Sequence, residues 1–213
     1  DRVFVRRDGK LTPASWDEAF AMIADAKPGS SIAAIAGDLV DCETMFAAKA
    51  LLKASGSSLM EGRQTGMDYD VSNLAAVNFN STLAGIENAD AILIVGSHVR
   101  WEAPLVNVRL RKAAKRGAKI FLVGARWDTT FGGEFLGTDL GVLNDLPGHV
   151  GDAFDAAERP AVIVGGAGLK GAHAKALALA SGWGAAFNVL HMAASRMGGL
   201  MLGYAQKGGI ADI

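Results

Sequence analysis

One segment of the sequence has the glycine spacing of a phosphate-binding loop. Gly166, Gly168 and Gly171 fit the pattern G-x-G-x-x-G between an apolar run and an expected helix. Glycines so placed let a pyrophosphate approach the backbone at a helix N-terminus. A dinucleotide site also needs an acidic residue about 20 residues further on, and the sequence has none between Glu158 and Asp212. We therefore expect a plain strand-to-helix turn rather than an NAD or FAD site.

The histidines are scattered along the sequence, at His98, His149, His173 and His191. No pair is spaced i, i+4 with a glutamate between its members, as a metalloprotease helix requires, so we expect no metal site. His98 stands out because it closely follows an apolar run that ends at Gly96. In open α/β sheets, ligands bind beyond the carboxyl ends of strands. The other interpretation, a histidine of a surface loop, stays open.

The sequence contains no motif that is typical of a catalytic serine or cysteine nucleophile. Ser81, Ser97 and Ser195 are outside any G-x-S-x-G motif, which argues against a hydrolase elbow. Cys42 falls in the first turn of an expected helix, where the helix dipole favours a thiolate. Acidic residues flank it on both sides and oppose that charge, so we expect a partly buried, structural cysteine.

Composition narrows the class of protein further. The 213 residues carry 21 Lys and Arg against 22 Asp and Glu, a balance that argues against a nucleic-acid or acidic-membrane surface. A basic run between Arg109 and Arg116 is expected to be a solvated helix face. One cysteine excludes a disulfide within the chain and a zinc or iron–sulfur site built from several thiolates. No apolar run approaches the ~20 residues of a membrane span, and no signal peptide is visible. Because the first residue is not methionine, we expect a piece of a longer chain.

Apolar runs alternate with helical patterns, which predicts a doubly wound, mostly parallel, Rossmann-like α/β sheet. We expect a hairpin with its turn at Asp8-Gly9, followed by a helix that Ser15 and Glu18 cap. Further strands are expected at 31–37, 91–95, 119–123 and 160–164, and further helices at 41–54, 71–78, 104–116, 149–158 and 172–181. Residues 125–148 are expected to form a long loop. We expect two lobes, 1–136 and 137–213.

The tail 187–204 is mostly apolar and is expected to be a helix that Gly198-Gly199 interrupts or ends. A helix that is apolar nearly all round is normally buried. We therefore expect an exposed apolar patch here and possible self-association through 187–204.

Several segments together resemble a known family. Their sequences are PASWDEA from Pro13, GIENADAILIVG from Gly85, EAPLVN from Glu102 and FNVLHMAASRMGGL from Phe187. They resemble the large subunit of respiratory complex I, the NADH-quinone oxidoreductase of bacteria, in the region after its iron–sulfur clusters. The resemblance covers essentially the whole chain. It also extends to the molybdopterin oxidoreductase superfamily, which implies a fold that binds a molybdopterin guanine dinucleotide.

Three stretches depart from the superfamily pattern. Where molybdenum enzymes commonly carry a Cys, selenocysteine or Ser ligand, this sequence has Arg63 and Gln64 without a thiol. Where they have Gly-Ser-Asn-Pro, it has Gly-Ser-His-Val, with His98 in place of Asn. Where they have Asp-Pro-Arg, it has Gly-Ala-Arg, with Gly124 in place of the acid and Arg126 retained. The resemblance therefore implies degenerate cofactor positions, and we expect no cofactor and no catalytic residue in this chain.

The resemblance favours a structural function. We expect a domain of the complex I peripheral arm, on the cytoplasmic side of the bacterial inner membrane or the matrix side in mitochondria. It would contact other domains and subunits, while iron–sulfur clusters in the N-terminal part of the parent subunit carry electrons from NADH toward quinone. One alternative is a fragment of a molybdopterin-dependent oxidoreductase with an altered site. Another is a free-standing nucleotide-binding enzyme that uses 166–171.

Overall fold

Five short runs of the chain form the parallel strands of one sheet. Their spatial order is β7 (Glu134–Gly137), β6 (Lys119–Val123), β5 (Ala91–Val95), β8 (Pro160–Val164) and β9 (Ala186–Val189). Every neighbouring pair is parallel. Strands covered on both faces need apolar residues at successive positions, and β5 is buried at all of its positions. The expected doubly wound α/β sheet is confirmed.

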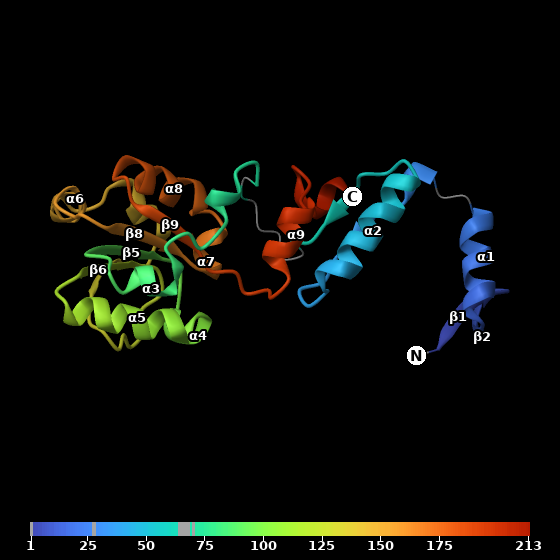
Figure 1. Cartoon of the computed structure of the whole chain (residues 1–213), viewed down its shortest axis with the longest axis horizontal. Helices are drawn as coiled ribbons and strands as arrows, with labels where there is room; N and C mark the ends of the chain where they lie inside the picture. Colours follow the sequence, from blue (N-terminus) through green and yellow to red (C-terminus); the bar gives the residue numbers. More distant parts are fainter. Residues whose placement is uncertain (1, 27–28, 64–68, 70) are drawn as a thin grey trace.

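Helices cover both faces of this sheet, as Figure 1 shows for α5 and α8. One face packs against α3 (Thr82–Ile86), α4 (Val99–Glu102) and α5 (Pro104–Lys115), and the other against α6 (Gly148–Asp155) and α8 (His173–Gly182). The central strand residues are at most 5% exposed, as their apolar runs predict: Ile92, Ile94, Ile120, Leu122, Val162 and Val164. Together with α7 (Gly166–Leu169), these elements form what we call the sheet unit, residues 74–190.

A second group of elements lies beside the sheet unit and is called the middle unit, residues 29–63 and 191–213. It contains a two-stranded parallel ladder of β3 (Ala34–Ile35) and β4 (Met60–Glu61), and the helices α2 (Cys42–Ala54) and α9 (Arg196–Leu202). Asp41 caps α2 by accepting a hydrogen bond from the Thr44 backbone N–H at 2.7 Å, as expected from the sequence. Buried Met45 and Tyr204 join α2 to the end of α9.

The first residues form an N-terminal unit, residues 2–26. The strands β1 (Val3–Arg7) and β2 (Lys10–Ala14) are antiparallel, and Asp8 and Gly9 both have positive φ, as a tight hairpin turn requires. The Ser15 hydroxyl accepts a hydrogen bond from the Glu18 backbone N–H at the start of α1 (Trp16–Ala26). The predicted hairpin and the Ser15 cap are confirmed, whereas the Glu18 carboxylate pairs with Arg7.

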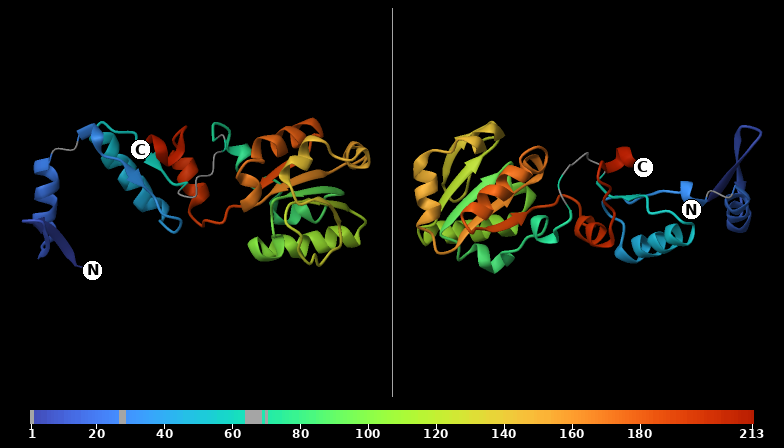
Figure 2. Two further views of the ribbon diagram at one scale, coloured as in Figure 1. Left: turned by 180° about the vertical axis from the view of Figure 1, so that it is seen from behind. Right: turned by 90° about the horizontal axis from the view of Figure 1, so that it is seen from above.

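The computed structural model describes residues 2–26, 29–63, 69 and 71–213. The three units follow one another along the long axis, with the sheet unit at one end and the N-terminal unit at the other (Figures 1 and 2). The chain ends in the middle unit, after a short 3-10 turn at Gly209–Asp212. Residues far apart in sequence therefore meet in the middle unit.

The tail differs from its predicted helix. Residues 186–189 form β9 because they extend the sheet beside β8, and only Arg196–Leu202 is helical. The glycines at 198 and 199 lie inside α9 instead of ending it. A Cβ on Gly198 would lie 2.5 Å from the Cys42 sulfur, so α9 packs closely on α2 at this glycine and the Cys42 side chain would have to move to admit a larger residue. The helix ends before Gly203, whose φ is +90°.

Other expectations were wrong in their local detail. The expected helix at 71–78 is only a 3-10 turn, Leu74–Ala76. The expected loop at 125–148 contains β7 and a 3-10 helix, Leu140–Asn144, because residues 134–137 pair with β6 at the sheet edge. The loop after β5 contains α4, and the strand expected at 31–37 is shortened to β3. The expected lobe boundary at 136 falls within β7, and the sheet takes strands from both sides of it.

Candidate functional site

A cavity of about 310 Å³ lies at the carboxyl ends of β5 and β6. The chain leaves β5 for β6 and β7 on one side and returns to β8 on the other, so β5 and β8 flank the point where the strand order reverses. Ligands of open α/β sheets bind at such a point. The cavity is at the small end of the range for ligand pockets. Its lining comes from the segment after β5 with α4, from the loop after β6, from the segment after β7 and from α7: Gly96, Ser97, His98, Glu102, Gly124, Ala125, Trp127, Thr138, Leu140 and Ala167.

The carboxylate of Glu102, from the short helix α4, accepts hydrogen bonds from both sides of this point. The Ser97 hydroxyl donates to Oε2 at 3.0 Å and the His98 backbone N–H donates to Oε1 at 2.9 Å. The Gly166 backbone N–H donates to Oε2 at 3.2 Å from the loop after β8. One side chain thus joins the loops that follow β5 and β8.

Within the 166–171 segment, close packing explains Gly168, whereas Gly171 has a positive φ of +99° and Gly166 meets only ordinary contacts. A Cβ on Gly168 would lie 2.5 Å from the Val95 carbonyl oxygen, and one on Gly96 would lie 2.1 Å from the Gly168 nitrogen. The backbone N–H groups of Ala167 and Gly168 both donate to the Gly96 carbonyl, at 3.0 and 3.2 Å. The first amides of α7 therefore already have partners within the chain, and Gly168 serves the approach of α7 to β5.

A strand, β9, follows α8, where the sequence predicted a helix, so the strand that a dinucleotide fold places after this helix is present. The missing acid still argues against a dinucleotide site, because neither β9 nor its next residue, Leu190, is acidic. The segment 166–171 therefore lacks the partner that would bind a ribose.

His98 lies at the cavity wall, at the carboxyl end of β5. Its ring stacks on Trp127 with 4.6 Å between centroids, and its Nδ1 atom is buried without a hydrogen-bond partner among the described residues. The Trp127 indole N–H donates to the Ser97 carbonyl at 3.1 Å, which fixes the loop. The position that the superfamily fills with Asn is thus part of an aromatic wall.

The third degenerate stretch follows β6. Gly124 has φ +128° and its N–H donates to the Gly137 carbonyl at 2.9 Å, which ties it to β7. Ala125 lines the cavity without a charge. Arg126 is exposed, and its guanidinium lies 5.3 Å from the Phe135 ring centroid. This stretch contributes no carboxylate to the cavity.

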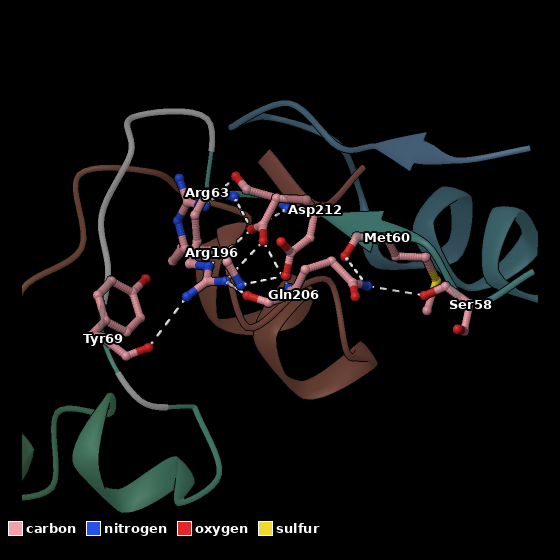
Figure 3. Close-up of polar contacts among 10 residues, drawn as sticks. Ser58, Met60, Arg63, Tyr69, Arg196, Gln206 and Asp212 are labelled. Carbon is pink, nitrogen blue, oxygen red and sulfur yellow. Dashed lines mark hydrogen bonds and ion pairs between the residues drawn. The ribbon is translucent and has the colours of Figure 1, made fainter. Parts of the chain in front are cut away.

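Arg63 occupies a different place, in the middle unit, where it is 2% exposed. Its Nη2 lies 2.9 Å from Oε2 of Glu61, which is fully buried, and its Nε donates to Oε1 at 3.0 Å. Arg63 also donates to the backbone carbonyls of Tyr69 and Gln206 (Figure 3). Gln64 lies outside the described residues. Arg63, the position where the resemblance would put a metal ligand, is therefore engaged in an internal ion pair.

The pair belongs to a wider polar network. The Gln206 backbone N–H donates to Glu61 at 2.8 Å. Arg196, 6% exposed, donates to the Gly62 carbonyl and to Asp38 at 2.9 Å. Figure 3 shows Arg196 beside Arg63 and the Gln206 amide directed toward Ser58 and Met60. The network fastens the tail 191–213 to β4.

Charge compensation sets the ionisation of Glu61. Burial by itself raises the pKa of this carboxyl, but the hydrogen bonds from the Arg63 side chain and from the Arg63 and Gln206 backbones outweigh it and lower the pKa. The carboxylate therefore stays charged and paired. The hydrogen-bond partners described for both side chains lie within the chain, which indicates a structural role for the pair.

An aromatic cluster links the network to the sheet unit. Tyr69 lies between His173 and His191, with ring centroids 5.6 and 6.0 Å away. Both histidines donate through Nε2 to backbone carbonyls, those of Ala76 and Val77. Burial lowers the pKa of His191 and raises the pKa of Tyr69, so both are neutral near pH 7. Their contacts are those of a packed core.

The remaining candidates have structural contacts. Ser195 donates to the Gly37 carbonyl, and Ser81 accepts from Asn188. His149 contacts Glu134 at the far end of β6. Cys42 is exposed, not partly buried as expected, because it begins α2 at the surface. Within the basic run, Arg109, Lys112 and Arg116 all pair with Glu87.

Sequence reasoning missed the two residues that organise these places, Glu102 and Arg196. Both lie in the segments that carry the family resemblance, which was the available signal. Their partners are remote in sequence, at Gly166 and Asp38, and no local pattern identifies them. Among the described residues, no group of three His, Cys, Asp or Glu side chains is placed to hold a metal ion. Of the helices in those same ranges, none has the length and apolar character to cross a bilayer.

Comparison with known sequences gives consistent matches. The profile of the molybdopterin oxidoreductase family matches residues 4–212. The mitochondrial 78 kDa subunit of NADH-ubiquinone oxidoreductase from Neurospora crassa is 36% identical over 94% of this chain and 30% of its own length. A subunit of the NADH-quinone oxidoreductase of Rickettsia prowazekii is 34% identical over 96% of this chain and 33% of its own. The chain thus spans about a third of the length of these relatives.

A solved structure supports the fold alone. The formyltransferase/hydrolase complex from Methylorubrum extorquens, solved with methylofuran, contains a chain that superposes with a TM-score of 0.57 at 18% identity. The superposition covers 88% of this chain and 60% of that one.

Proposed function

Because this chain belongs to the molybdopterin oxidoreductase family, and its relatives are subunits of NADH-quinone and NADH-ubiquinone oxidoreductase, we propose that it is a cofactor-free structural domain of such a subunit. It supports electron transfer from NADH to quinone by the complete complex without carrying electrons itself. Iron–sulfur clusters are expected in other parts of the parent subunit. The chain is not a catalyst on its own.

One observation carries this proposal: the buried pair of Arg63 and Glu61. The resemblance puts the molybdenum ligand of the enzymes at this position. A guanidinium has no lone pair to offer a metal, and this one is already bound on several sides. Removing it to admit a cofactor would leave Glu61 charged and buried, which is strongly unfavourable. The residues present do not fit the cofactor.

The cavity at the strand ends supports the same proposal. Glu102 holds the donors at the crossover, and His98, Gly124 and Ala125 offer no carboxylate for a nucleotide. The sequence departs from the family pattern at three separate stretches. Such departures are expected when a protein keeps the fold of a family but no longer binds its cofactor.

The partners are other domains and subunits of the complex's peripheral arm, on the cytoplasmic face of the bacterial membrane or the matrix face in mitochondria. Exposed apolar side chains on α1, among them Trp16, Phe20 and Ile23, support contact with a partner. Self-association through 187–204 has weaker support. Phe187, Leu190 and Leu200 are buried within this chain, and the large apolar side chains exposed there are Met192 and Met201.

The alternative, a molybdopterin-dependent oxidoreductase fragment, has one observation in its favour: the cavity lies where such a fold binds ligands. It requires Arg63 and Glu102 to leave their partners. The two proposed functions therefore predict different effects of substitutions at Arg63 and Glu102.

The test uses the complete complex with Arg63→Met in its large subunit. A structural role predicts less assembled complex, measured on native gels, with NADH:quinone turnover per assembled complex unchanged. Arg100→Met is the control, because Arg100 is half exposed and pairs with Asp128, which is itself exposed. Full assembly with lower turnover per complex would contradict the structural role.

A further inference from the structure

We infer that β3 is an open sheet edge of the middle unit, and that a strand from the rest of the parent subunit pairs with it. The inference deepens the proposed function by naming a contact surface of this domain and the segment that covers it. It rests on that function, because it requires the chain to be part of a longer subunit.

The two edges of the β3–β4 ladder differ. The outer edge of β4 is taken by the tail of the chain, since the Gly62 N–H donates to the Tyr204 carbonyl at 3.1 Å. The Gln206 side-chain amide donates to the carbonyls of Ser58 and Met60 at 3.0 and 3.1 Å (Figure 3). Among the described residues, β3 has a neighbouring strand on one side alone, which is β4.

The backbone of β3 shows which groups this edge presents. The N–H groups of Ala34 and Ala36 both donate toward β4, to the carbonyls of Leu59 and Glu61, each at 2.9 Å. Successive residues of a strand direct their N–H and C=O groups to opposite edges, so those of Ile35 point away from β4. They have no hydrogen-bond partner among the described residues. The Ile35 backbone is therefore available for a further strand.

The side chains of this segment suit a covered strand. Ala34 and Ala36 pack toward α2 in the apolar cluster of Met45 and Leu52. Side chains alternate along a strand, so Ile35 lies on the opposite face, where it is 51% exposed. Parallel sheets normally have both faces covered. An added strand, with the elements that follow it, would supply the missing cover for Ile35.

The edge also lacks the features that protect a free edge. Natural edge strands commonly carry a charged residue or a proline that discourages pairing. Residues 31–37 have neither. This apolar run is typical of a strand buried on both faces, yet only residues 34 and 35 are paired. The sequence is thus suited to a longer, central strand.

The rest of the parent subunit is the occupant that the comparisons favour. This chain spans 30% and 33% of the length of two relatives, so most of such a subunit lies outside it. A segment of the same polypeptide reaches the edge at an effective concentration of about millimolar, which a separate copy of the chain lacks. Strand addition uses main-chain hydrogen bonds for affinity and alternate side chains for specificity.

Hydrogen exchange at Ile35 tests the pairing on unaltered protein. In the full chain at low micromolar concentration, the Ile35 amide should exchange faster than those of Ala34 and Ala36, which are bonded toward β4. In the large subunit of the complete complex, it should exchange more slowly than in the chain by about ten-fold or more. Equal rates in the two samples would overturn the inference. Protection that appears in the isolated chain as its concentration rises would identify a second copy as the occupant and contradict it too.

A proline variant separates pairing from burial alone. Ile35→Pro removes the outward N–H, and proline is tolerated at a sheet edge when its missing N–H faces outward. Ile35→Ala is the matched control, because it loses the apolar side chain and keeps the N–H. On native gels, Ile35→Pro should give well under half the assembled complex that Ile35→Ala gives. Equal assembly of the two variants would overturn the inference. If the isolated chain with Ile35→Pro is unfolded by circular dichroism, the exchange comparison decides.

A photo-reactive amino acid at position 35 identifies the occupant in the complete complex. Benzoylphenylalanine placed there should cross-link within the large subunit, to a peptide outside the segment that corresponds to this chain. A cross-link to a different subunit would contradict the inference. These failures would leave the proposed function standing, because that function fails on a different result, which is full assembly with lower turnover in Arg63→Met.

Discussion

The sheet unit and the middle unit differ in what lies at their centres. In the sheet unit, strands such as β5 are buried at every position and pack against apolar helix faces on both sides. In the middle unit the centre is an ion pair, Glu61 with Arg63, in which both side chains are at most 2% exposed. Arg196 and Asp38 extend that network.

The difference coincides with the stretches where the sequence departs from the family pattern. The sheet unit keeps the apolar pattern that any doubly wound sheet needs, whatever it binds. The middle unit holds the stretch where the resemblance puts a metal ligand, and there a buried ion pair lies beside a smaller apolar cluster of Met45, Leu52, Met60 and Tyr204. Stability in the first unit rests on apolar area, and in the second on a smaller apolar core together with compensated charge.

The largest effect is expected from Arg63→Met. Removing one member of a buried pair leaves an uncompensated charge and costs about 3–5 kcal/mol. Chemical denaturation of the chain measures the loss. The double variant Arg63→Met, Glu61→Gln removes both charges and should recover much of it. A loss below about 1 kcal/mol would show that the middle unit is not held by this pair.

The same pair predicts a pH dependence with a definite sign. The lowered pKa of Glu61 stabilises the folded wild type above the unfolded value of about 4.3, and this stabilisation is lost as the pH falls through the folded pKa. In Arg63→Met, burial without a partner raises that pKa, so the deficit relative to wild type should shrink as the pH falls from 7 toward 4. A deficit independent of pH would contradict the charge-based account.

A large but different effect is expected from Ile94→Ala at the centre of the sheet. Ile94 is 1% exposed, and a large-to-small change in a core costs about 2–5 kcal/mol, with no dependence on pH. Ile35→Ala in β3 is the matched control, because Ile35 is 51% exposed. Equal losses of unfolding free energy for both variants would mean that β5 is not the core of the sheet.

A moderate effect is expected within the glycine motif. Gly168→Ala forces a Cβ to within 2.5 Å of the Val95 carbonyl and should cost about 1–3 kcal/mol, measured by chemical denaturation. Gly166→Ala meets only ordinary contact, 3.5 Å from Met192, and should leave stability unchanged or raise it by up to about 1 kcal/mol. Equal changes in the free energy of unfolding for the two variants would contradict the explanation that close packing requires glycine at 168.

The smallest effect is expected from Glu87→Gln on the surface of the sheet unit. Hydrogen bonds from Arg109 lower the pKa of Glu87 despite opposing desolvation, with Lys112 and Arg116 adding to the shift. The three cations are exposed although Glu87 is only 15% exposed, so the fall in melting temperature should be small and should largely vanish in about 1 M salt, which screens exposed charges. A fall as large and as salt-insensitive as that of Arg63→Met would show that burial is not what separates the two units.

Much of the fold could be predicted from local pattern. The strands 91–95, 119–123 and 160–164 are apolar runs bounded by glycine or a charged residue. Asp41 and Ser15 stand directly before helical patterns, so the sequence alone predicts them as N-caps. The error at 187–204 has a physical cause, because four apolar and amide residues fit a strand or a helix equally until a neighbouring strand is known. Pairing with β8 decided it.

For the candidate site, the sequence could predict only which residues differ from the family pattern, at Arg63, His98 and Gly124. The sequence shows that Arg63 cannot ligate a metal, but not that Glu61 neutralises it beside Gln206, since the contact of Glu61 with Gln206 spans 145 residues. It shows a glutamate at 102, but not that its carboxylate meets Gly166. Such contacts depend on strand order, which no local spacing encodes.

The most direct test titrates the full wild-type chain with guanosine diphosphate by calorimetry. We expect no binding of useful affinity, because Glu102 already holds the donors at the strand crossover and no acid directly follows β6 to engage a nucleotide. A dissociation constant below about 10 μM, roughly −7 kcal/mol, would contradict the loss of the cofactor site and restore a nucleotide-binding function to this domain.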